Sequence, residues 1–360
     1  MAWQLRRQAD RQYYPSFCLA RLAGSILVVA IHGAPFPPEA AGLNFLVQHW
    51  LARIAVPFFF ASSGYFLYRK TTLEQFDPGP TKAFVLRMLR IYLIWTAIFF
   101  PLSAQTYRGD EKGFVHSVLW YIRSFLFEGS YFHLWYLPAV IVAVLLVSYL
   151  LHKKVSPPRI LCAAGALYLA GLLGQSWFGL IRPLETAAPA VWSGLKLVQK
   201  VIRTTRNGLF DGFLFVGIGM LFAFYEIRLA RKTALLGFAG SMLLVLAEGV
   251  LLERAGFARM HDAYLTLPLA LFFGFALVLG ARPPAGRHYA VLQDLSALVY
   301  FLHPLVGAGP LPGAWLDRLA GAVGISAYFP KALLYTLLVS AVILLLARLP
   351  GFGWLKKAYH

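Results

Sequence analysis

The sequence predicts an all-α protein, a polytopic bundle of transmembrane helices. Of its 360 residues, 59% are hydrophobic and only 13% are charged, and the mean hydropathy is +0.65. These values lie far from those of a soluble globular domain. About ten apolar stretches also approach the length that a helix needs to cross a bilayer. The basic residues beside these stretches follow the pattern that membrane topology requires.

The apolar stretches define the predicted spans, since a crossing helix needs roughly 20 residues. They are 17–36, 46–68, 84–103, 132–151, 160–174, 208–226, 233–252, 263–280, 291–310 and 330–348. The aromatic run 114–127 carries His116 and Arg123 and is followed directly by Glu128, so we expect it to be interfacial or re-entrant. Span 160–174 is short for the bilayer, and we expect its ends to lie further out.

The basic residues predict the orientation. Ten crossings place most lysines and arginines between the spans on one side, which should be the cytoplasm. They are Arg6, Arg7, Arg11, Arg69, Lys70, Lys82, Lys153, Lys154, Arg228, Arg231, Lys232, Arg282, Arg287, Lys356 and Lys357. Both termini are therefore predicted to be cytoplasmic, and the first apolar run to be a retained helix rather than a cleaved signal peptide. The basic stretch 196–206 on the outer side indicates contact with an anionic acceptor or snorkelling side chains.

We expect a single integral-membrane domain over residues 1–360, because the longest polar-containing stretch, 175–207, is too short to build a soluble core. The net charge of +18 does not indicate nucleic-acid binding, since the basic residues flank apolar spans. Cys18 and Cys162 lie in apolar runs and match no disulfide, metal or haem spacing. No metal and no bound cofactor are expected. No nucleotide-binding loop or nucleophile elbow occurs in the sequence.

Arg21 and His32 are ionisable residues inside the first span, and such residues are functional candidates in a membrane. They lie eleven positions apart. This spacing is close to three helical turns, so both side chains share one helix face, about 16 Å apart along the axis. A neutral imidazole is a suitable general base near pH 7, and a guanidinium suits a phosphate ligand. Snorkelling of Arg21 and a simple hydrogen-bonding role for His32 are the structural alternatives.

Five further residues within the spans are candidates for the site. Arg53 needs a carboxylate, a carbonyl or a polar cavity around it. Ser63 offers a hydroxyl beside a glycine that allows close helix packing. Glu248 either orients a histidine or forms a structural ion pair. Tyr300 and His303 lie where a following proline loosens the helix. Three polar residues are expected to be interface or loop residues: His133, His261 and Asp262.

Several motifs occur in order over nearly the whole chain. They are Arg21 with His32 in VVAIHGAPF, then FFFASSGYFLYRK, KAFVLRMLRIYLIWT from Lys82, HLWYL at 133–137 and YFLHP at 300–304. Together they resemble the acyltransferase 3 family of integral-membrane acyltransferases. They also resemble the membrane domain attached to serine/alanine racemases.

This resemblance implies a ten-helix membrane enzyme that passes an acyl group, usually acetyl, from cytoplasmic acyl-CoA to a hydroxyl on a glycan. It implies that His32 is the essential histidine and Arg21 its paired basic residue. Arg87 and Arg90 match the basic pair that opens the third helix, where contact with phosphate is expected. Ser63 and its following glycine match the family's Ser-Gly, and Glu248 is a looser match with an expected catalytic role.

The sequence-based hypothesis is therefore a membrane O-acyltransferase of the bacterial inner membrane. Arg21 with Arg87 or Arg90 would bind acyl-CoA, and His32 would be the general base. The expected substrate-binding residues are Arg53, Ser63, Tyr300 and His303. The expected partners are acyl-CoA, a glycan or lipid-linked acceptor, and membrane lipids. The alternative is a transporter of amino acids or glycans, which intramembrane charges and a broken helix would serve equally well.

Overall fold

The computed structural model describes residues 14–108, 113–284, 286–307, 314–326 and 328–360, and all regular structure within them is helical. The predicted cytoplasmic residues Arg6, Arg7 and Arg11 and the end of span 291–310 lie outside these ranges. The helices are α2 (Pro15–Gly33), α3 (Ala41–Phe45), α4 (Ala55–Tyr68), α5 (Gly79–Arg108), α6 (Phe114–Phe127), α7 (Tyr136–His152), α8 (Pro157–Leu172), α9 (Leu184–Ala187), α10 (Pro189–Ile202), α11 (Phe213–Tyr225), α12 (Arg231–Arg254), α13 (Leu267–Gly280), α14 (His288–Gly307), α15 (Ala314–Ala322) and α16 (Tyr328–Leu346). The short turns are η1 (Pro38–Ala40), η2 (Leu46–Trp50), η3 (Leu51–Ile54), η4 (Phe178–Leu180), η5 (Gly208–Gly212) and η6 (Gly353–Ala358).

Seven helical segments in the described chain are long and apolar enough to cross a membrane. They are Pro15–Gly33, Pro38–Tyr68, Gly79–Gln105, Gly208–Tyr225, Arg231–Arg254, His288–Val306 and Tyr328–Leu346. The predicted all-helical, multi-pass bundle is therefore the architecture of the described chain. Helices α7, α8 and α13 are apolar but shorter, so the total of about ten crossings stays a prediction.

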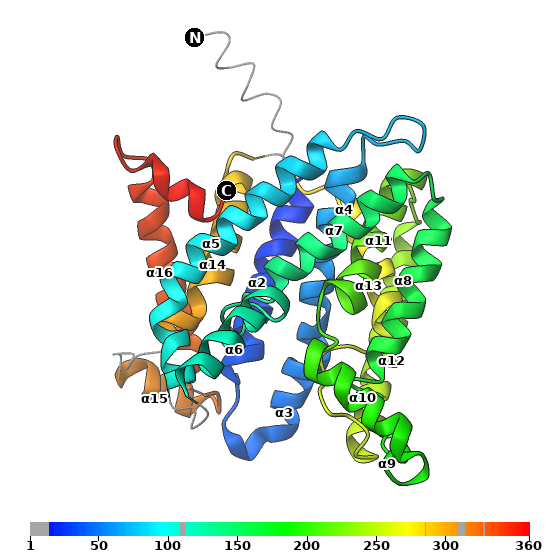
Figure 1. Cartoon of the computed structure of the whole chain (residues 1–360). Coiled ribbons are helices and arrows are strands. Elements are labelled where there is room, and N and C mark those ends of the chain that lie inside the picture. The colour runs from blue at the N-terminus through cyan, green and yellow to red at the C-terminus, as the bar shows by residue number, and fades with distance from the viewer. Residues whose placement is uncertain (1–13, 109–112, 285, 308–313, 327) are drawn as a thin grey trace.

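Helix α2 lies in the middle of the bundle, with α5, α14 and α16 on one side and α4, α11, α13 and α8 on the other (Figure 1). Two apolar clusters hold these groups together. The larger one joins α4, α7, α8, α11 and α13 and includes Phe60, Val216 and Phe275, none of which is exposed. The smaller one joins α5 to α14, where the rings of Trp95 and Phe301 stack with centroids 5.0 Å apart. Helix α2 contributes Phe17 to the larger cluster and Val28 to the smaller one, so it packs against both halves.

Helices α2 and α14 run parallel and in register. The Ser25 hydroxyl donates to the Ser296 carbonyl oxygen over 2.8 Å and lies 2.9 Å from the Ser296 hydroxyl. Two turns further along both helices, the rings of His32 and His303 stack with centroids 5.4 Å apart. Both pairs are 271 positions apart in the chain. The two helices therefore carry their polar residues along one shared seam from end to end.

The beginning of α2 and the last residue of the chain lie at one end of the bundle, which we call the terminal end (Figure 1). Here Arg69 donates to the Tyr14 hydroxyl over 2.5 Å. His360 pairs with Asp294 at 3.3 Å, and the preceding turn η6 packs on α5. The two ends of the described chain therefore lie on the same side of the bundle. Which end faces the cytoplasm stays a prediction.

The contact between α4 and α11 is a backbone-to-backbone crossing that depends on two glycines. A Cβ atom added to Gly64 would overlap the Val216 carbonyl oxygen, and one added to Gly219 would overlap the Ala61 carbonyl oxygen. Backbone atoms of packed helices cannot step aside as a flexible side chain does. The small residues therefore set how closely these two helices approach.

We expect Gly219→Ala to separate α4 from α11 and to destabilise the protein by about 1–3 kcal/mol or more. Gly240→Ala in α12 is the matched control, because its added Cβ meets open space and alanine favours the helix. Thermal unfolding of both purified variants in detergent measures the difference. Equal melting temperatures for the two variants would show that the crossing tolerates a methyl group.

Candidate functional site

A cavity of about 630 Å³ lies between α2, α4, α5, α7 and α14 toward the terminal end. We call it the basic cavity because Arg21 and Arg87 line it. The Arg21 guanidinium lies 5.3 Å from the centre of the Phe66 ring, and the Arg87 guanidinium lies 5.4 Å from that of Phe84. Within the described chain neither arginine has an ion-pair partner. Asp294 also lines this cavity, but its carboxyl pairs with His360. Two guanidiniums in one lining fit an anionic ligand such as a phosphate.

Hydroxyl groups from α4, α7 and α14 also line the basic cavity. The Ser63 hydroxyl donates to the Phe59 carbonyl oxygen over 3.0 Å and lies 3.1 Å from the Tyr136 hydroxyl. The Tyr300 hydroxyl donates to the His133 carbonyl oxygen over 2.5 Å. The structure thus places Ser63 and Tyr300 in one cavity with Arg21 and Arg87, and it adds Tyr136, which the sequence analysis did not single out.

A second cavity of about 50 Å³ lies on the other side of Tyr300, which lines both. We call it the histidine cavity. Its polar lining residues are His32, Arg53, His133, Arg206, Asp211 and Asp262. His32 is exposed, and its ring stacks on His303 and meets Phe132 edge-on with centroids 4.7 Å apart. The volume holds only a few waters, so a larger ligand would lie against the exposed side of His32.

Two further histidine rings surround this cavity. His303 is buried, and its Nδ1–H donates to the Tyr300 carbonyl oxygen over 2.8 Å, which leaves Nε2 as the unprotonated nitrogen of the neutral ring. His133 is 1% exposed and lies between His303 and Phe99, with ring centroids 5.3 and 4.8 Å away. The expectation that His133 anchors a membrane interface is therefore wrong. Its segment is a turn before α7 that points the ring inward.

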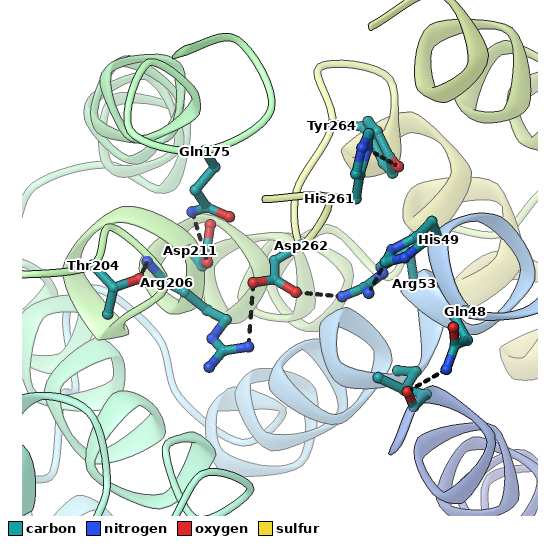
Figure 2. Close-up of polar contacts among 11 residues, drawn as sticks. Gln48, His49, Arg53, Gln175, Thr204, Arg206, Asp211, His261, Asp262 and Tyr264 are labelled. Carbon is teal, nitrogen blue, oxygen red and sulfur yellow. Dashed lines mark hydrogen bonds and ion pairs between the residues drawn. The ribbon is translucent and has the colours of Figure 1, made fainter. Parts of the chain in front are cut away.

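Asp262 joins two arginines in the wall of the histidine cavity (Figure 2). Its Oδ1 lies 2.5 Å from Nη1 of Arg53, and its Oδ2 lies 3.2 Å from Nη1 of Arg206. Burial raises the pKa of this carboxyl, but Arg206 and Arg53 outweigh burial and hold the pKa below its ordinary value. The other Nη of Arg53 lies 3.0 Å from Nδ1 of His49, and the Arg206 guanidinium lies over the Trp135 ring. Asp262 is therefore ionised and part of the cavity wall, not an isolated loop residue.

Two π-helical turns position these arginines. Arg53 follows η2, and Arg206 precedes η5. The Asn207 side chain accepts hydrogen bonds from two backbone N–H groups of η5 and fixes where that turn begins. The Gln48 amide in η2 donates to the Ile31 carbonyl oxygen over 2.7 Å, directly before His32. Irregular helical turns of this type are frequent at functional sites, where they redirect side chains.

Two sequence-predicted site residues lie apart from both cavities. The Glu248 carboxylate accepts hydrogen bonds from the Trp177 indole, the backbone N–H groups of Leu265 and Thr266, and the Thr266 hydroxyl, at 2.6–2.9 Å. It thereby holds the loop that leads into α13. Arg90 is exposed on α5 and lines neither cavity. The structure does not bring these two residues to His32.

These features define a class of protein: a multi-pass helical membrane protein whose two polar cavities meet inside the bundle. The chain matches the model of the acyltransferase 3 domain, described as an acyltransferase domain, over residues 15–348. The protein belongs to this family, as the motifs predicted, and the family supports a membrane acyltransferase in general.

The chain is also similar to three curated bacterial proteins. It is 36% identical over 298 residues to a serine/alanine racemase of Enterococcus gallinarum and 30% identical over 295 residues to an amino-acid racemase of Enterococcus faecalis. Each alignment covers 80% of this chain and 40% of the relative, so the chain spans less than half the length of these relatives. No solved structure matches the chain.

Proposed function

We propose that the protein is a membrane O-acyltransferase. It moves an acyl group, with acetyl as the expected group, from cytoplasmic acyl-CoA to a hydroxyl of a glycan or other cell-envelope acceptor at the bacterial inner membrane. Family membership supports the class of reaction. The observation that carries the proposal is the meeting of two cavities at Tyr300, one lined by Arg21 and Arg87 and the other by His32.

Acyl-CoA binds in the basic cavity in this proposal. Arg21 and Arg87 contact its phosphates, because neither has an ion-pair partner among the residues that the structure describes. About three turns of α2, or about 16 Å, separate Arg21 from His32, which suits the pantetheine arm in length. The arm runs along α2 past Ser63 and ends at Tyr300. Arg90 lies on the same helix as Arg87 and would contact the donor only outside the cavity.

The transfer itself is a direct attack. The His32 imidazole takes the proton of the acceptor hydroxyl, and the hydroxyl oxygen forms a bond to the thioester carbonyl carbon. The carbon–sulfur bond then breaks, and the CoA sulfur takes the proton back from the imidazolium. The products are an ester and free CoA. The Tyr136 hydroxyl is our candidate to stabilise the oxyanion, since the Ser63 and Tyr300 hydroxyls already donate to backbone carbonyl oxygens.

Transport of an amino acid is the second candidate function. The observation that favours it is that the similar chains are named for serine/alanine and amino-acid racemases. A membrane part of such a protein would supply a racemase with its substrate. The two functions differ in one product. An acyltransferase releases CoA in proportion to the acceptor that it modifies, whereas a transporter releases none.

We expect Arg21→Gln and Arg87→Gln each to raise the KM for acetyl-CoA by roughly 10- to 100-fold, since each removes a charge-assisted contact to phosphate. The rate at saturating donor should change much less. Arg159→Gln is the control, because Arg159 is exposed on α8. Release of CoA by the protein in lipid nanodiscs measures both quantities. An unchanged KM in both cavity variants would contradict the assignment, and Arg90→Gln tests whether the second basic residue takes part.

A further inference from the structure

Arg53 and Arg206 offer the histidine cavity more hydrogen-bond donors than the protein uses. A guanidinium has five N–H groups. The Arg53 side chain is only 9% exposed, and its Nη atoms contact Asp262 and His49 while its buried Nε has no partner in the described chain. The Nε of Arg206 is also buried and has no hydrogen-bond partner among the described residues. Leaving such donors unpaired is costly, so they indicate a missing acceptor.

The carboxylates around the cavity do not satisfy both arginines. Asp262 is shared between Arg53 and Arg206. The other carboxyl in the lining, Asp211, accepts from the Gln175 amide over 3.4 Å and bonds to neither arginine (Figure 2). Two guanidiniums therefore divide one carboxylate between them. A second carboxylate would satisfy the remaining N–H groups in the planar geometry that guanidinium prefers.

We propose that the acceptor carries a carboxylate close to the hydroxyl that is acylated, and that Arg53 and Arg206 bind this carboxylate. A volume of about 50 Å³ admits a group of a few atoms and not a sugar ring. The carboxylate therefore enters the histidine cavity, while the rest of the acceptor lies against the exposed side of His32. Transfer of the acyl group to the neighbouring hydroxyl rests on the proposed function. Binding of the carboxylate by Arg53 and Arg206 is independent of it.

Binding of small hydroxy acids tests the proposal without any acyl donor. The probes are lactate, gluconate and glucuronate, each compared with its uncharged amide, on the protein in nanodiscs by titration calorimetry. We expect at least one acid to bind the wild type roughly 10- to 100-fold more tightly than its amide, as one or two charge-assisted hydrogen bonds would give. Arg53→Lys and Arg206→Gln should lose this preference, and Arg206→Lys should keep part of it.

Arg259→Gln is the matched control, since Arg259 lies in the same loop as Asp262 but is exposed and outside the cavity. Thermal unfolding shows that each variant is folded, and Asp262 keeps one arginine in every variant. Equal binding of acid and amide in all three pairs would overturn the proposal, as would a preference that survives in both Arg53→Lys and Arg206→Gln. Because no acyl-CoA is present, this outcome is independent of whether the protein releases CoA.

Discussion

His32→Ala is expected to lower acetyl-CoA turnover by roughly 100- to 10,000-fold, which is the contribution of a positioned general base. The fold should not change, because His32 is exposed and its contacts are with the rings of His303 and Phe132. CoA release in nanodiscs measures the turnover, and the melting temperature of the same sample reports the fold.

The control is His152→Ala, which removes an exposed histidine at the end of α7, outside both cavities. It should retain full turnover. Full turnover in His32→Ala, with the protein correctly inserted, would exclude His32 as the base. If the wild type releases no CoA, the transport function gains support and amino-acid uptake becomes the assay.

Glu248→Ala is expected to destabilise the protein by roughly 3–5 kcal/mol, because it removes the shared acceptor of four partly buried donors. Turnover per folded molecule should remain, since Glu248 lines neither cavity. Glu248→Gln keeps one acceptor oxygen, so its melting temperature should lie between those of the wild type and Glu248→Ala. Thermal unfolding together with CoA release measures both effects.

Glu253→Ala in the same helix is the matched control, since that side chain is 60% exposed and pairs with His261. It should change the melting temperature little, as exposed ion pairs contribute little to stability. The opposite result for Glu248→Ala, lost turnover at an unchanged melting temperature, would support the catalytic role that the family resemblance implies.

The placement of Arg21 and His32 was predictable because both lie on one regular helix. Their spacing fixes a shared face and a separation of about three turns, whatever surrounds them. The structure adds that these two positions face two cavities, which meet at Tyr300. That division comes from how α2, α4, α7 and α14 pack, and no pattern within a single span encodes it.

Asp262 was not predictable as a site residue. It lies in a loop between two spans, and its partners Arg53 and Arg206 are 209 and 56 positions away in the chain. The stretch 196–206 was the one sequence signal for this part of the site, because its lysines and arginines lie on the predicted outer side, where the positive-inside rule does not expect them. For Glu248 the sequence pointed to the wrong kind of partner. Its place in an apolar run indicated an ion pair or a histidine, whereas its carboxylate accepts hydrogen bonds from backbone N–H groups of a loop.

The two cavities meet at Tyr300, whose hydroxyl donates to the His133 carbonyl oxygen, and this arrangement has a consequence for the membrane potential. In the proposed reaction the acyl donor approaches Tyr300 from the basic cavity and the acceptor approaches it from the histidine cavity, and the two react where the cavities meet. An acyl group moves one way and the hydrogen of the acceptor hydroxyl moves the other way onto the CoA sulfur. The exchange carries no net charge, so its equilibrium should not depend on the membrane potential, and the reaction can proceed in an energised membrane without dissipating the gradient.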